Sequence, residues 1–178
     1  MKDIDIMAAL ASGRGPKPKE RAADGPDDYS DMVFDMLETG VWIVKQSPKP
    51  RGGAPEDDEQ ARLFTWLRDP DGGRSHGLIS HSVPNDGVSS KERMVALKRT
   101  GLTKGVCDLY VMGHQGNLAI EMKRVNGTAS DVSNEQMGHL ASLAAFPLWQ
   151  SCVCYGYRAA RAAIERFLLG APARRITP

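Results

Sequence analysis

The stretch DLYVMGHQGNLAIEMKR, residues 108–124, decides the fold of this chain. Two β-rich runs, 108–113 and 117–124, are joined by His-Gln-Gly, which is the pattern of an antiparallel hairpin. Side chains two residues apart project from the same face of a strand, so Glu121 and Lys123 are predicted to lie side by side. Asp108 opens the first strand and is predicted to lie across the hairpin from them.

This arrangement of two acids and a lysine favours phosphoryl chemistry. Placing such groups together is costly unless they serve a purpose. Two carboxylates can hold a hard cation such as Mg²⁺, which polarises a phosphoryl oxygen and lowers the pKa of a bound water. A lysine there can hold or deprotonate the attacking water and stabilise developing charge. The residues alone leave open an alternative, in which Glu121 and Lys123 form a solvated strand face and Asp108 is a turn residue.

The elements around the hairpin predict a mixed α/β fold. Helical patterns occupy 55–68, 89–101, 133–146 and 158–170, and strand patterns occupy 76–84 and 149–157, with a turn at 85–87. Ser133 and Gln136 form a capping-box pattern at one helix start, and Gly101 is the expected C-terminal cap of another. The order α, β, α, β, β, α, β, α predicts a mixed β-sheet flanked by helices.

The N-terminal third is predicted to be an extension of this domain. Residues 12–26 have the composition of a flexible connector, 27–38 a short amphipathic helix with an acidic outer face, and 41–45 a strand. Residues 46–55 contain three prolines and two glycines, so no regular element is expected to cross them. The predicted division is therefore an extension over 1–54, the main domain over 55–170 and a tail over 171–178.

Composition excludes several classes of protein. The 178 residues are 41% hydrophobic and 25% charged with a formal net charge of +1, which excludes a polycation but allows a local basic face. No run approaches the roughly 18 apolar residues of a membrane span. Three cysteines, an odd number, suit no disulfide framework and favour a reducing cytoplasm, with Cys152 and Cys154 as buried thiols. No phosphate-binding loop ending in Lys-Ser or Lys-Thr is present, which argues against an ATP-driven motor.

Several ordered blocks resemble the VRR-NUC domain, the virus-type replication–repair branch of the PD-(D/E)xK nuclease superfamily. The resemblance is carried by GLTKGVCDLYVM, GNLAIEMKR and SNEQMGHLASL, and by PEDDEQARLFTWL, SVPNDG, LKRTGLTKGVCD and CVCYGYRAARAAIERFL around them. It covers about residues 55–170 and implies a restriction-endonuclease-like core, as in free-standing, phage-encoded members of about this length. One departure is Cys107, where the superfamily usually has a proline, which supplies backbone shape rather than chemistry.

The resemblance implies a role for each matching residue. Asp108 and Glu121 would be metal ligands for Mg²⁺ or Mn²⁺, Lys123 the catalytic lysine, and Gln136 a group on the next helix directed at the same site. Glu56, four residues before Gln60, matches the family's additional first-helix acid and would be a third metal ligand. Glu59, one turn further on, takes its place if the helix register is shifted.

A basic segment leads into Asp108. Residues 91–104 carry five positive charges and one negative, and Lys98, Arg99 and Lys104, with Asn85 in the preceding turn, are the predicted DNA-binding residues. The alternative is a solvated helical face of the ordinary kind.

These observations predict a metal-dependent nuclease that hydrolyses phosphodiester bonds in DNA. The resemblance implies branched or flapped DNA as substrate, a role in replication, recombination or repair, and the cytoplasm of a bacterial or phage-infected cell. A homodimer is expected because dimers are the commonest oligomers and a two-stranded substrate has near two-fold symmetry. Two alternatives remain: a non-catalytic nucleic-acid-binding module that retains the nuclease fold, and a structural or packaging accessory protein that binds partners through the acidic segment 24–38.

Overall fold

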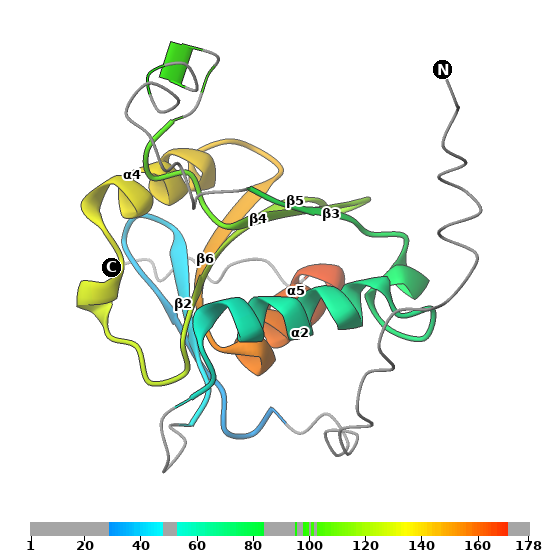
Figure 1. Ribbon diagram of the computed structural model, residues 1–178. Helices are drawn as coiled ribbons and strands as arrows, with labels where there is room; N and C mark the ends of the chain where they lie inside the picture. The colour runs from blue at the N-terminus through cyan, green and yellow to red at the C-terminus, as the bar shows by residue number, and fades with distance from the viewer. Residues whose placement is uncertain are drawn as a thin grey trace, which may run out of the picture.

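The computed structural model describes residues 29–47, 53–83, 95, 98–99, 101 and 103–170 (Figure 1). The strands are β1 (Val33–Met36), β2 (Val41–Lys45), β3 (Ile79–Ser82), β4 (Leu109–Gly113), β5 (Gly116–Lys123) and β6 (Trp149–Tyr155). The α-helices are α2 (Glu56–Arg68), α4 (Asn134–Ala144) and α5 (Tyr157–Leu168), and short 3-10 turns occupy Gly73–His76 and Ala129–Asp131.

The six strands form one mixed sheet in the order β1-β2-β6-β5-β4-β3. Strand β6 pairs in parallel with both β2 and β5, and the other neighbouring strands pair in antiparallel fashion. The predicted α/β class, with a mixed sheet flanked by helices, is confirmed.

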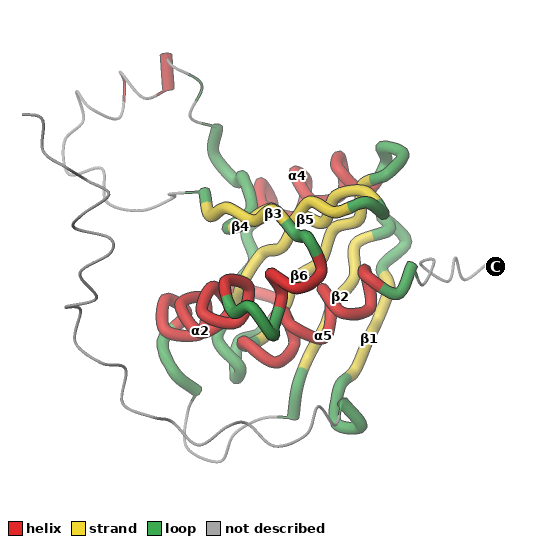
Figure 2. The backbone as a smooth tube through the Cα atoms, turned by 90° about the vertical axis from the view of Figure 1, so that its right-hand side faces the viewer, coloured by secondary structure: helices red, strands yellow, loops and turns green. Residues whose placement is uncertain are grey.

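Helices cover both faces of the sheet, with α2 and α5 on one face and α4 on the other (Figures 1 and 2). On the first face, Leu63 and Trp66 of α2 and Ile164 of α5 pack against buried sheet residues such as Ile120. On the second face, Leu140 of α4 joins a smaller apolar cluster with residues of β2, β5 and β6. Burying apolar surface in two layers holds the central hairpin rigidly between them.

The predicted hairpin is confirmed as β4 and β5. Its register runs from the pair Leu109–Ile120 to the pair Gly113–Gly116. The loop that leads into β4 passes close to α4. At the closest point is Gly105, a loop residue with a φ of +81°. A Cβ at Gly105 would lie 2.6 Å from the backbone carbon of Glu135, so only glycine allows this approach.

The N-terminal predictions need two corrections. Residues 33–36 of the predicted helix form the strand β1, because pairing with β2 satisfies their backbone and Phe34 packs against the core. The predicted start of the domain at residue 55 is also too late. Strand β2 pairs with β6 and buries Val41, Trp42 and Val44, so residues 33–45 belong to the same sheet as the hairpin. A short apolar run finds its partner only in the tertiary fold, and its own sequence does not reveal that partner.

The remaining elements agree with the sequence where the structure describes them. The predicted strands at 41–45, 76–84 and 149–157 and the helices at 55–68, 133–146 and 158–170 are confirmed within a few residues. The three cysteines are buried and free. The turn at 85–87, most of the helix at 89–101, the segment 12–26 and the tail at 171–178 lie outside the described residues. None of the helices in the described part of the chain has the length and apolar character needed to span a membrane.

Candidate active site

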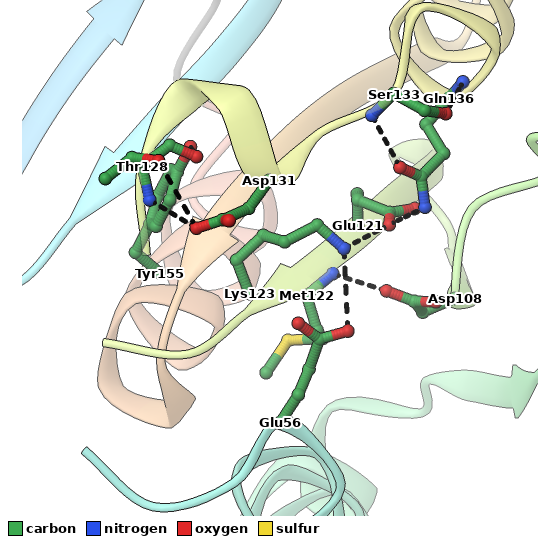
Figure 3. A network of polar contacts seen from close by, with 10 residues as sticks. All are labelled: Glu56, Asp108, Glu121, Met122, Lys123, Thr128, Asp131, Ser133, Gln136 and Tyr155. Carbon is green, nitrogen blue, oxygen red and sulfur yellow. Dashed lines mark hydrogen bonds and ion pairs between the residues drawn. The ribbon is translucent and has the colours of Figure 1, made fainter. Parts of the chain in front are cut away.

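The hairpin brings the two predicted acids together. Leu109 pairs with Ile120, so the next residues outward, Asp108 and Glu121, lie at the same level of the sheet. The Asp108 Oδ2 atom accepts a hydrogen bond of 2.7 Å from the backbone N–H of Met122 (Figure 3). The side chain of Asp108 is therefore hydrogen-bonded to β5 beside Glu121, the other predicted metal ligand.

Glu121 and Lys123 share a face of β5, as the two-residue spacing predicts. The Nζ atom of Lys123 lies 2.7 Å from Oε1 of Glu121 and 3.5 Å from Oε1 of Glu56 (Figure 3). Glu121 is fully buried and Lys123 is 6% exposed, so neither belongs to a solvated strand face. An ion pair this deep in the protein is stabilising only when its remaining polar atoms are also satisfied.

Gln136 reaches the same carboxylate from α4. Ser133 caps this helix: its hydroxyl accepts from the Gln136 N–H, and the Gln136 Oε1 atom accepts a 2.9 Å bond from the Ser133 N–H. This capping box occupies the amide oxygen and leaves the Nε2 group to donate to Glu121 Oε1 (Figure 3). The capping box thus positions Gln136 as a hydrogen-bond donor to the site.

Glu56 enters the site from the first turn of α2. This helix begins with four consecutive acids, a composition that the positive end of the helix dipole favours. Glu56 is half-buried, and burial is the main cause of its raised pKa, with repulsion from Asp108 adding to the shift and Lys123 opposing it. The structure therefore brings Glu56, Asp108, Glu121, Lys123 and Gln136 into one cluster.

Burial and the neighbouring charges also shift the pKa values of Glu121 and Lys123. Burial, followed by repulsion from Asp108, raises the pKa of Glu121 to about 7, although the hydrogen bond and charge of Lys123 oppose the shift. Burial lowers the pKa of Lys123, but its hydrogen bond to Glu121 and the surrounding carboxylates outweigh burial, and the net shift is upward. At neutral pH Lys123 is therefore an ammonium group, while Glu121 is partly protonated.

The raised pKa of Glu121 predicts a fall in stability as pH rises. The pKa of a glutamate in the unfolded chain is about 4.3. Between that value and about 7 the folded protein binds more protons than the unfolded chain, so this contribution is complete below the lower value and lost above the upper one. We expect Glu121→Gln to flatten the decrease in unfolding free energy between pH 5 and pH 7.5, measured by urea denaturation. Equal decreases in the two proteins would contradict this assignment.

The donor set of this cluster fits a hard divalent cation. Glu121 Oε2 is buried without a hydrogen-bond partner, which leaves one carboxylate oxygen open beside Asp108. Among the residues that the structure describes, no three His, Cys, Asp or Glu side chains are already arranged around a metal position. Lys123 lies between Glu121 and Glu56 instead. Mg²⁺ is commonly held by only one or two carboxylates, with waters and substrate phosphates completing its shell.

Glu59, the alternative to Glu56, points elsewhere. It is 1% exposed, and its Oε2 atom accepts a 2.8 Å hydrogen bond from the backbone N–H of Tyr157 at the start of α5. The helix register therefore directs Glu56, and not Glu59, to Lys123.

The predicted DNA-binding residues are only partly described. Lys98 and Arg99 are exposed, while Asn85 lies outside the described residues. Lys104 is exposed and forms an ion pair with Glu135 in the first turn of α4. The contact that the structure describes for Lys104 is therefore with α4 and not with the cluster of acids.

Sequence reasoning missed an aromatic cluster on the same sheet face. Tyr110 lies two residues after Asp108, and its hydroxyl is 2.9 Å from Nε2 of His139 on α4. The Tyr110 ring also contacts the rings of His81 and Trp149, with centroids 5.4 and 5.6 Å away. Strand alternation alone places Tyr110 on the face of Asp108, but the contacts from β3, α4 and β6 depend on the tertiary fold.

The structure is thus an α/β fold, a mixed sheet with helices on both faces that carries this ionisable set on the β4–β5 hairpin. A solved structure described as a VRR_NUC domain protein is similar to this chain, with a TM-score of 0.50 at 20% sequence identity. The match covers 67% of this chain and 92% of that one, so the chain has a VRR-NUC-like fold, as the sequence resemblance predicts. No protein-family model and no curated protein sequence matches the chain.

Proposed function

We propose that this protein is a metal-dependent nuclease that hydrolyses phosphodiester bonds in DNA. The observation that supports this proposal most strongly is the convergence of the half-buried Asp108 on the buried pair Glu121 and Lys123. A VRR-NUC-like fold carries the cluster, which favours nuclease chemistry over other uses of two acids and a lysine. Asp108 and Glu121, with Glu56 directly or through a water, are the residues that would hold Mg²⁺ or Mn²⁺.

Lys123 and Gln136 have separate roles in the proposed reaction. A bound cation would supply Lewis-acid polarisation of the phosphoryl group and a more acidic water. Lys123 is held as an ammonium group by its carboxylate neighbours, so it acts as a hydrogen-bond donor and a fixed positive charge. It can therefore hold the attacking water or a phosphate oxygen and stabilise the charge that develops there. Gln136 orients the Glu121 carboxylate through its Nε2 hydrogen bond.

The proposal also includes the residues that contact DNA, the kind of DNA that is cleaved and the oligomeric state. Lys98, Arg99, Lys104 and Asn85 would contact the DNA backbone, which gives register rather than sequence specificity. Branched or flapped DNA is the proposed substrate, with a homodimer as the proposed assembly.

A cleavage assay tests the proposed function. Supercoiled plasmid, single-stranded DNA and a branched DNA are each incubated with the protein in Mg²⁺, in Mn²⁺ and in excess chelator. We expect cleavage with a divalent cation and none with chelator. Absence of cleavage of all three DNAs with either metal would overturn the proposal, and equal cleavage with chelator would overturn the metal requirement.

Glu56→Gln is expected to raise the metal concentration needed for half-maximal cleavage by about 10-fold, the lower end of the range for groups that support a metal site. The apo protein should be at least as stable, because the substitution removes a half-buried carboxylate that Asp108 repels. A metal titration of the cleavage rate, together with thermal unfolding in chelator, measures both effects. Glu59→Gln is the matched control, and a larger shift in the control than in Glu56→Gln would contradict the assignment of Glu56.

A further inference from the structure

Glu59 connects the first turn of α2 to the start of α5. Its carboxylate is almost completely buried, and Oε2 accepts the backbone N–H of Tyr157, the first residue of α5. An anionic group at a helix N-terminus pairs with an N–H group that has no partner within the helix. Arg62 lies 3.8 Å from the same oxygen, and its guanidinium stacks over the Tyr157 ring at 4.7 Å.

The start of α5 is in turn fastened to the end of β5. The backbone N–H of Gly156 donates a 2.7 Å hydrogen bond to the carbonyl of Lys123. Gly156 has a φ of +95°, and a Cβ there would lie 2.6 Å from Val125, so glycine permits this close turn between β6 and α5. The backbone of Lys123 is thus tied to the residue before Tyr157.

These contacts link Lys123 to the start of α5 and to the first turn of α2, which are themselves linked to each other. Its side chain reaches Glu56 on α2, at 3.5 Å, while its backbone reaches Gly156. Glu59, one helical turn from Glu56, holds the adjacent Tyr157. Pro55, which precedes α2, makes no side-chain cap hydrogen bond to this helix. Glu59 is thus the first-turn residue of α2 whose side chain is bonded to the start of α5, and Arg62, one turn further on, contacts the same tyrosine.

We propose that Glu59 is a positioning residue, which sets the distance between Glu56 and Lys123 by locking α2 to the start of α5. The inference rests on the proposed nuclease function, because it assigns Glu56 and Lys123 to the reaction. Glu59 itself touches neither of them. Mutation of a residue that orients a metal-site ligand typically costs about 10- to 100-fold in metal affinity or activity.

The test compares Glu59→Ala with Glu59→Gln in a double-mutant cycle with Glu56→Gln. Glu59→Ala removes the acceptor for the Tyr157 N–H, and we expect it to raise the half-maximal metal concentration about 10-fold. Glu59→Gln retains an acceptor oxygen, so its half-maximal metal concentration should stay close to that of the wild type. In the Glu56→Gln background, Glu59→Ala should change the half-maximal metal concentration less than twofold, because its effect passes through Glu56.

Phe167→Leu is the stability control, since Phe167 is a buried core residue near the C-terminal end of α5, away from the start of that helix. If Phe167→Leu, at an equal loss in melting temperature, raised the metal requirement as much as Glu59→Ala, the role of Glu59 would be structural only. Independent, additive effects of Glu59→Ala and Glu56→Gln would also overturn the proposal.

A second readout separates this inference from the proposed function. The ammonium resonance of Lys123 in ¹⁵N NMR spectra should shift in Glu59→Ala, in the direction seen in Glu56→Gln, and stay unchanged in Phe167→Leu. This result would support positioning by Glu59 even if the wild-type protein cleaved no DNA. An unchanged Lys123 resonance in Glu59→Ala would refute the positioning role whatever the cleavage assay showed.

Discussion

Replacing Lys123 with methionine is expected to lower the DNA cleavage rate by about 10²- to 10⁴-fold, the range for a side chain that transfers or holds a proton in the reaction. Methionine keeps much of the aliphatic length of lysine but lacks the ammonium group that contacts Glu121 and Glu56. The fold should persist, because loss of Lys123 raises the pKa of Glu121 further and lets the buried carboxyl become neutral. Initial cleavage rates at saturating Mg²⁺, compared for the two folded proteins, measure the effect.

Lys45→Met is the matched control for this experiment. Lys45 is an exposed lysine at the end of β2, with its ammonium 5.0 Å from the centre of the Tyr155 ring. It lies on the same sheet but outside the acid cluster, so its loss should change the rate less than twofold. Equal cleavage by Lys123→Met and the wild type would remove Lys123 from the reaction.

Asp108→Asn is expected to lower cleavage by about 10³-fold, because weaker metal binding would lose part of the several kcal/mol by which the cation stabilises transition-state charge, and each 1.36 kcal/mol corresponds to about a factor of 10. The asparagine oxygen can still accept the N–H of Met122, so the hairpin should keep its geometry. DNA binding in chelator should be equal or tighter, since a negative charge near the phosphates is lost. Cleavage kinetics and a binding titration with the same labelled DNA provide the two measurements.

The same variant separates an enzyme from a binding module. A module that acts by occupancy needs no metal ligand, so wild type and Asp108→Asn would then bind DNA alike in a salt-dependent manner and neither would cleave it. That outcome would replace the proposed nuclease by the binding-module alternative.

The hairpin and its chemistry could be predicted because their signals are local. Strand alternation places Glu121 and Lys123 on one face, and the pairing of Leu109 with Ile120 places Asp108 beside them. The capping box of Ser133 and Gln136 likewise predicts where α4 begins. That Gln136 then donates to Glu121 depends on how α4 packs on the sheet, and only the family resemblance indicated it.

Other features required tertiary information. Residues 33–36 have apolar positions compatible with a helix, and only their pairing with β2 makes them a strand. Glu56 and Glu59 are both acids in the first turn of one helix, and their sequence does not show which one faces Lys123. The burial of Glu59 against α5 could not be inferred from spacing, because its partner is a backbone N–H 98 residues away. An acid buried by a distant backbone group leaves no periodic signal in the sequence.

We propose that Asp108 and Glu121 share one divalent cation. Crystals soaked in Mn²⁺ and measured for anomalous scattering test it most directly, because the signal locates the metal independently of activity. We predict one strong peak within coordination distance of both carboxylates, with Glu56 a direct ligand or bridged by a water. The contradicting result is an ordered Asp108 and Glu121 with no peak between them at a Mn²⁺ concentration that saturates cleavage.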